Sequence, residues 1–234
     1  MVKFVAMKFM YYGHACFSLT VGGKKLLFDP FIKLNEAAKA IDINSIEADY
    51  ILLSHAHFDH TADAIEIAKR TGAKVIASWE VANWAEKNGI KNTHPMNPGG
   101  QFAFDFGKVR CTIAQHSSSF QDGSDGGNPM GFLITNQEGE SVYYAGDTAL
   151  TLDMQLIPHF THHLKAAILP IGDNFTMGYE DAAIAASFCK TNNVIAVHFD
   201  TFGYIKVDHE KVKTYFKDKH IAITLPEIGQ AFDI

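Results

Sequence analysis

A cluster of potential metal ligands stands out in the first half of the sequence. The stretch 54–60 reads SHAHFDH, and its last six residues hold three imidazoles and one carboxylate. Burying such groups without partners would cost on the order of 2–7 kcal/mol each, so a role as core residues explains them poorly. Imidazole and carboxylate are the usual zinc ligands. The motif therefore predicts a metal site, with His55 and His57 on one ion and Asp59 and His60 turned toward a second.

The residues on either side of this motif predict a turn between a strand and a helix. Residues 50–53 form a short apolar run that is typical of a buried strand. Residues 61–70 place small and aliphatic side chains on one side of an expected helix. Side chains at alternate positions of such a turn can converge on one point.

Three more potential ligands follow apolar strands later in the chain. His116 comes after residues 109–114, Asp147 after residues 142–145, and His198 after residues 194–197. In layered α/β folds, sites form at the ends of strands. We therefore expect these three side chains to share one cleft with the motif.

The order of the expected elements indicates an α/β fold. Residues 17–21 and 25–28 favour strands, and Gly22 and Gly23 between them are a two-residue hairpin signal. Residues 131–135 and 141–145 form a second hairpin, and the two hairpins end at Asp29 and Asp147. Helices are expected over residues 36–40, 61–70, 80–87, 153–163, 179–190 and 207–217. We infer two similar halves, each a sheet with helices on its outer face, in one domain spanning residues 1–234.

Composition and charge exclude several classes of protein. The 234 residues are 47% apolar and 20% charged, which is typical of a folded globular domain. The net charge of −6 offers no electrostatic footprint for nucleic acid. No run approaches the ~18 apolar residues of a membrane span, and the three cysteines form no CxxC pair. Residues 1–8 are interrupted by lysines, unlike a signal peptide, so we expect a cytoplasmic protein.

Taken together, the motifs resemble those of a known superfamily. HAHFDH at 55–60, with His116, Asp147 and His198 downstream in that order, resembles the metallo-β-lactamase fold superfamily. The segments GH at 13–14, HSSS at 116–119, GNP at 127–129, GDT at 146–148 and LPIGDNFTMG at 169–178 are similar to the UPF0173 metal-dependent hydrolases. That branch is related to the ascorbate-6-phosphate lactonase group. The resemblance spans roughly residues 8–200 and implies a four-layer αββα sandwich with a two-metal site.

The resemblance also implies which residues hold the two ions. The ligands come from the motif and from three later strand ends. They comprise His55, His57 and His116 on the first ion, Asp59, His60 and His198 on the second, and Asp147 as a bridge. No cysteine is among them, so nothing restricts the site to soft metals. Zinc is the first candidate, and manganese and iron stay open because imidazole and oxygen donors suit all three. Two ions about 3.5–4 Å apart would lower the pKa of a shared water and supply hydroxide near neutral pH.

Further residues are candidates for supporting roles. His14 is a candidate neutral donor or general acid facing the metals, or else a turn histidine packed in the core. Asp59 could also accept a proton from the water. Asp29 either orients a ligand histidine or occupies an ordinary turn before a proline. The candidates to line the substrate cleft, or instead to satisfy donors at a helix N-terminus, are Asp173, Asn174 and Thr176.

The function implied by these residues is hydrolysis of a small ester, lactone or phosphoester by an activated hydroxide. A nuclease or phosphodiesterase of the same fold is the first alternative, and the acidic balance argues against it. A redox di-iron protein is disfavoured because such relatives usually carry Glu in place of the second His of the motif. A metal-dependent sensor or binding module stays open, since a ligand set indicates metal capacity and not turnover. The sequence leaves the substrate, the native metal and association into homo-oligomers open.

Overall fold

The computed structural model describes residues 6–234, which form two mixed sheets. The expectation about the opening segment falls in part on residues 1–5, which lie outside the described residues. In spatial order, one sheet consists of β14 (Ala231–Asp233), β1 (Lys8–Gly13), β2 (Cys16–Val21), β3 (Lys24–Phe28), β4 (Tyr50–Leu52), β5 (Lys74–Ser78) and β6 (Thr93–Met96). The other consists of β13 (Ala222–Thr224), β12 (Asn193–Val197), β11 (Leu164–Pro170), β10 (Ser141–Tyr144), β9 (Met130–Asn136), β8 (Gly107–Ile113) and β7 (Gln101–Phe104).

The two sheets repeat one pattern of strand pairing. In the first, the antiparallel hairpin β2–β3 is followed by β4, β5 and β6, which pair in parallel. In the second, the antiparallel pair β9–β10 is followed by β11, β12 and β13, also in parallel. Gly22 and Gly23 close the first hairpin with φ values of 55° and 78°, which suit a two-residue turn of this kind. The prediction of two similar halves is confirmed.

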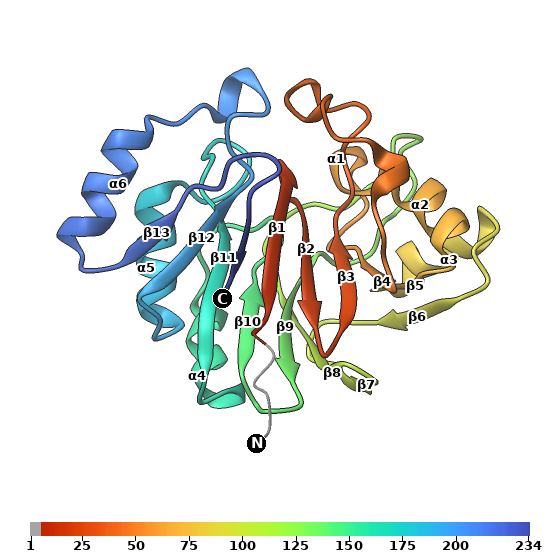
Figure 1. Cartoon of the computed structure of the whole chain (residues 1–234), viewed down its shortest axis with the longest axis horizontal. Helices are drawn as coiled ribbons and strands as arrows, with labels where there is room; N and C mark the ends of the chain where they lie inside the picture. The colour runs from red at the N-terminus through yellow and green to blue at the C-terminus, as the bar shows by residue number, and fades with distance from the viewer. Residues whose placement is uncertain (1–5) are drawn as a thin grey trace.

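Helices cover the outer face of each sheet. They are α1 (Phe58–Thr61), α2 (Ala64–Thr71), α3 (Trp79–Lys87), α4 (Ile157–Phe160), α5 (Tyr179–Phe188) and α6 (His209–Asp218). Figure 1 shows α1, α2 and α3 on one side of the paired sheets and α5 and α6 on the other. This arrangement is the predicted αββα sandwich. Among residues 6–234, no helix is both long enough and apolar enough to cross a membrane.

Alternation along the strands supplies three apolar layers. Leu26 and Phe28 of β3 belong to the cluster between the sheets, whereas Leu27 belongs to the cluster beneath the helices of the first half. Successive side chains of a strand point to opposite faces, so one apolar run can serve two layers. In the second half, α5 and α6 contribute Ala182 and Phe216 to a third cluster.

Several predicted helices are shorter than expected. Residues 36–40 contain only a 3₁₀ turn, Glu36–Ala38. Its N-cap is Asn35, whose side chain accepts a hydrogen bond from the Ala37 backbone N–H. The helix expected over 153–163 is divided between a 3₁₀ segment, Leu152–Leu156, and the single turn of α4. The helix expected over 61–70 is divided into α1 and α2 at Ala62 and Asp63. The carboxylate of Asp63 accepts from the backbone of residues 32 and 33. These are long-range contacts, to residues 31 and 30 positions earlier in the chain, made at the break between α1 and α2.

Candidate metal centre

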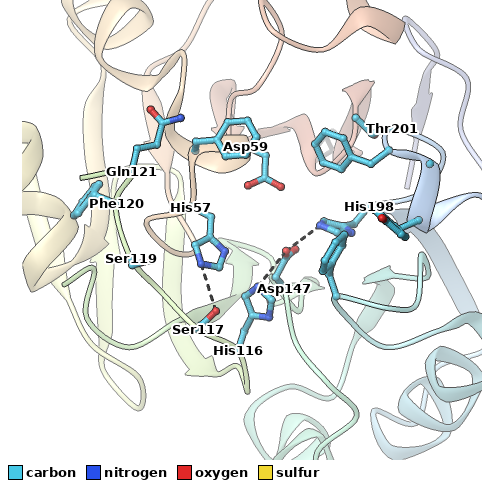
Figure 2. Close-up of a pocket in the computed structure, with 15 residues that line it drawn as sticks. His57, Asp59, His116, Ser117, Ser119, Phe120, Gln121, Asp147, His198 and Thr201 are labelled. Carbon is cyan, nitrogen blue, oxygen red and sulfur yellow. Dashed lines mark hydrogen bonds and ion pairs between the residues drawn. The ribbon is translucent and has the colours of Figure 1, made fainter. Parts of the chain in front are cut away.

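The seven predicted ligands converge from the ends of four strands in both sheets. The motif follows β4, whereas His116, Asp147 and His198 follow β8, β10 and β12. Figure 2 shows the imidazoles of His57, His116 and His198 and the carboxylates of Asp59 and Asp147 directed toward one another. Among the described residues, potential ligand atoms lie within 4.8 Å of one another in three groups. These groups are His55, His57 and His116; His55, His60 and Asp147; and His14, Asp59, His60 and His198.

Hydrogen bonds from neighbouring residues fix the orientation of His55. The Ser54 hydroxyl donates to Asp29 Oδ2 over 2.6 Å, so it can only accept from His55 Nδ1, which lies 2.9 Å away. The proton of a neutral His55 therefore sits on Nδ1. Its Nε2 lone pair then faces the cluster, 2.9 Å from His57 Nδ1. Burial lowers the pKa of His55 well below its usual value, which keeps this imidazole neutral and able to bind a cation.

Asp29 lies behind the motif and collects four hydrogen bonds in the core. Its Oδ1 accepts from the Ser54 backbone N–H at 2.7 Å. Its Oδ2 accepts from the Ser54 hydroxyl, from His60 Nδ1 at 2.9 Å and from the Tyr144 hydroxyl at 2.7 Å. Burial and the Asp29 charge raise the pKa of Tyr144 well above its usual value, so this hydroxyl stays a donor. Asp29 thus holds the Nδ1 proton of His60 and directs Nε2 into the cluster.

Asp147 lies between the two sets of predicted ligands. Its Oδ2 is 3.3 Å from His60 Nε2, 3.7 Å from His116 Nε2 and 3.0 Å from His198 Nε2. Burial works against its charge, but His198 and His60 outweigh burial and lower the pKa of Asp147 well below its usual value. Burial likewise works against a charged His60, and Asp147, Asp29 and Asp59 outweigh it and raise the pKa of His60. The carboxylates that stabilise an imidazolium here would also stabilise a metal cation.

Three polar atoms of the predicted ligands are buried without a hydrogen bond to any described residue, and two of them, other than His198 Nδ1, test whether a metal fits. Within residues 6–234, His60 Nε2 and Asp147 Oδ1 are buried and make no hydrogen bond. Leaving such a group unsatisfied costs about 1–3 kcal/mol. In the neutral form of His60 the proton on Nδ1 is donated to Asp29, so Nε2 presents a lone pair to a space bordered by carboxylates. A divalent cation would satisfy both atoms, so the residues present fit a metal centre.

His14, at the turn between β1 and β2, contacts the motif. It is 1% exposed, with Nε2 3.0 Å from Asp59 Oδ2 and Nδ1 3.0 Å from Thr201 Oγ1. Burial, followed by the charge of His198, lowers the pKa of His14 to about 4 although Asp59 acts in the opposite direction. His14 is therefore neutral at pH 7. Its position suits a neutral donor to Asp59, and it is not among the residues that line the cavity.

Unusual backbone conformations place several of these groups. His14, Asp29 and His198 have φ values of 56°, 41° and 54°, in the left-handed region that residues with a Cβ seldom adopt. Such strain persists only where the surrounding structure enforces it, and it gathers at functional sites. Gly146 precedes Asp147 with φ +67°, and a Cβ there would lie 2.7 Å from the Met130 carbonyl oxygen. Only glycine suits this turn.

A cavity of about 870 Å³ opens onto the metal centre. His57, Asp59, His116, Asp147 and His198 form one end of it. Asp173, Asn174 and Thr176 were expected to line the cleft, but they are not among its lining residues. The loop turns through positive φ at residues 173 and 174, and Phe175 lines the cavity in their place.

The sequence interpretation missed three residues that position these groups. Ser54 and Tyr144 support Asp29, and Thr201 supports His14. Ser54 stands directly before the first histidine of the motif, which was the one available signal. The other two are brought to the site from β10 and from the loop after β12, at distances along the chain that no local pattern reveals.

Comparisons with known proteins agree with this geometry. The family model described as Beta-lactamase superfamily domain matches residues 24–199. A UPF0173 metal-dependent hydrolase from Flavobacterium johnsoniae is 51% identical over 228 residues, covering 97% of this chain and all of the relative. The chain belongs to the UPF0173 metal-dependent hydrolases of the metallo-β-lactamase superfamily. Another UPF0173 metal-dependent hydrolase, from Methylacidiphilum infernorum, is 47% identical over 225 residues, covering 96% of this chain and 99% of the relative.

Solved structures support the same assignment. A metallo hydrolase from Ignicoccus hospitalis has a TM-score of 0.85 and 30% identity, covering 98% of this chain and 100% of that one. The isothiocyanate hydrolase from Delia radicum gut bacteria has a TM-score of 0.77 and 20% identity, covering 97% and 99%, and shows the shared fold alone. The UPF0173 protein described here is thus a metal-dependent hydrolase whose His and Asp cluster can bind metal.

Proposed function

We propose that this hydrolase uses two divalent ions to cleave a small ester, lactone or phosphoester. Zinc is the first candidate, with manganese and iron as alternatives, because imidazole and carboxylate suit all three. The proposed ligands are those that the resemblance implies, with Asp147 shared between the ions. The observation that carries the proposal is the position of Asp147 Oδ2, within 3.0–3.7 Å of His60, His116 and His198.

The chain's own residues supply the remaining chemistry. When bound, divalent ions at such a site act as Lewis acids and make a water acidic enough to give hydroxide near pH 7. Asp59 would be the acceptor for a proton from such a water. Burial works against its charge, but His60 and His14 lower its pKa, so the carboxylate is ionised. His14 holds the Asp59 carboxylate in place through Nε2. Ser54 and Asp29 keep His55 and His60 with their Nε2 lone pairs inward.

A small molecule is the proposed partner, and the cytoplasm is the proposed compartment. The cavity beside the cluster, about 870 Å³, has the size of a small-molecule site. Cys16, Cys111 and Cys189 are buried free thiols, which supports a reducing compartment.

Metal analysis combined with a substrate panel tests the proposal. Elemental analysis of the purified protein should find two divalent ions per chain, and EDTA should abolish hydrolysis. The panel contains lactones, thioesters, phosphodiesters and RNA, which separates the bond classes. His57→Ala should lose activity and metal, whereas His159→Ala, at an exposed position on α4, should retain both.

Two results would contradict this proposal. Activity that survives both EDTA and His57→Ala would place the catalytic centre elsewhere. A protein that binds two ions yet turns over no member of the panel would favour a metal-dependent sensor or binding module.

A further inference from the structure

The cavity that opens onto the metal centre is lined largely by aromatic rings. Of its fifteen lining residues, five carry benzene rings. These are Phe58, Phe120, Phe175, Phe202 and Tyr204. They come from the motif, from the loop after β8, from the loop after β11 and from the loop after β12. Four separate segments therefore contribute apolar surface to one space.

Other aromatic side chains hold most of these rings in place. Phe58 and Phe202 both pack against the buried ring of Phe31, with centroids 5.6 and 6.3 Å apart. Phe120 stacks on Trp84 at 5.0 Å. At the mouth of the cavity, Phe175 and Tyr204 form an edge-to-face pair at 6.2 Å. These separations are typical of stabilising aromatic pairs. Phe58, Phe120 and Phe202 are held by rings of the fold itself, whereas Tyr204 is 80% exposed and is held by its pairing with Phe175.

The charges of the cavity are confined to its metal end. Its charged lining residues are Asp59 and Asp147, both in the ligand cluster. In the part of the chain that the structure describes, no lysine or arginine lines the cavity. The other polar lining side chains outside the cluster, such as Ser117, Gln121 and Thr201, are neutral. An anionic group placed away from the metals would face aromatic rings without a cationic partner, and its desolvation would be uncompensated.

We propose that the substrate carries, away from its reacting bond, a neutral apolar group of about the size of an aromatic ring that packs between these five side chains. The inference rests on the proposed hydrolytic function, which puts the reacting bond at the metal centre. Within that function it selects uncharged aryl or alkyl compounds. Sugar phosphates, nucleotides and other substrates with a second anionic group are excluded.

Three p-nitrophenyl esters that differ only in the acyl group test the substrate class. They are the acetate, the neutral 3-phenylpropanoate and the monoanionic glutarate. In each case water adds to the carbonyl carbon, the bond to the phenolate oxygen breaks, and a carboxylate and p-nitrophenolate are released. With the metal-loaded enzyme, kcat/KM should be at least tenfold higher for the phenylpropanoate than for the acetate. The glutarate ester should be at or below the acetate.

Variants of the mouth of the cavity connect this preference to the rings. Phe175→Ala and Tyr204→Ala should each reduce the preference for phenylpropanoate over acetate by threefold or more. Phe102→Ala is the matched control, because Phe102 on β7 is 47% exposed, Phe175 is 49% exposed, and Phe102 does not line the cavity. The control should leave the preference unchanged. A glutarate ester cleaved as well as the phenylpropanoate would overturn the inference.

A binding measurement separates this inference from the proposed function. The neutral fluorophore N-phenyl-1-naphthylamine, titrated into the 234-residue protein, should bind, and it should bind at least threefold more weakly to Phe175→Ala. Binding without turnover of any ester would contradict the proposed function and support an apolar ligand. Equal binding by wild type, Phe175→Ala and Phe102→Ala would overturn the inference even if the esters are hydrolysed.

Discussion

Replacing Asp29 by asparagine should weaken metal binding without removing any predicted ligand. Both oxygens of Asp29 accept hydrogen bonds, four in total, and the side chain is fully buried. An amide NH₂ at either position must face a donor. An NH₂ at the Oδ2 position would favour the His60 tautomer that carries its proton on Nε2. That nitrogen needs a free lone pair to bind a metal. Changes of this kind typically cost 10–100-fold in metal affinity, which is about 1.4–2.7 kcal/mol.

The same substitution should also lower the stability of the metal-free protein. One buried donor left facing another costs about 1–3 kcal/mol. Chelator competition would measure the metal affinity, and urea unfolding of the metal-free protein would measure the free energy of unfolding. Both quantities should fall in Asp29→Asn.

Asp63→Asn is the matched control for this prediction. Asp63 is also buried, at 3% exposed, and it accepts from the backbone N–H groups of Ile32 and Lys33 without touching a predicted ligand. Its substitution should lower stability but leave metal affinity within about twofold. If Asp29→Asn and Asp63→Asn bound metal equally well, the argument that Asp29 sets the His60 tautomer would be refuted.

Three further predictions follow from the site and the core. Chelation should lower the melting temperature, because an ion at 100 times its Kd stabilises the folded state by about 2.7 kcal/mol. Calorimetry with and without metal checks this, and equal melting temperatures would contradict it. Gly146→Ala should reduce bound metal by displacing Asp147, because a Cβ would lie 2.7 Å from the Met130 carbonyl oxygen. Elemental analysis checks this, and full metal content would contradict it. The three buried cysteines should resist Ellman's reagent at pH 8 until the protein unfolds. Burial raises the pKa of Cys111 and of Cys189 to about 12, which leaves almost no reactive thiolate. Rapid reaction of the native protein would contradict this.

Much of the fold could be predicted because its signals are local. The hairpin at Gly22 and Gly23, the buried strand before the motif and the alternation of strands and helices each depend on a few neighbouring residues. Helix lengths were predicted less well. The expected helix over 61–70 is broken at Asp63, whose carboxylate accepts from the backbone of Ile32 and Lys33, far away in the sequence. Those bonds depend on where the chain turns in three dimensions.

The residues of the candidate site could also be predicted only where their signal was local. HAHFDH predicted a metal site because four ligating groups occur in six residues. The recurrence of His116, Asp147 and His198 after strands indicated a shared cleft. In the loop at 173–176 the backbone has positive φ at residues 173 and 174, and Phe175, not the three polar residues, lines the cavity. The backbone conformation of an irregular loop is not encoded in a pattern that can be read residue by residue.

The sequence by itself determined the ligand types, the strand ends that carry them and the layered α/β class, because each follows from local spacing and polarity. Only the tertiary structure decided that Ser54, Asp29 and Tyr144 form one hydrogen-bonded support beneath His55 and His60. It also decided that five rings from four segments line the same cavity as the ligands. The physical reason is that hydrogen-bond direction and cavity shape depend on distances between residues far apart in the chain, which exist only once the two sheets have packed together.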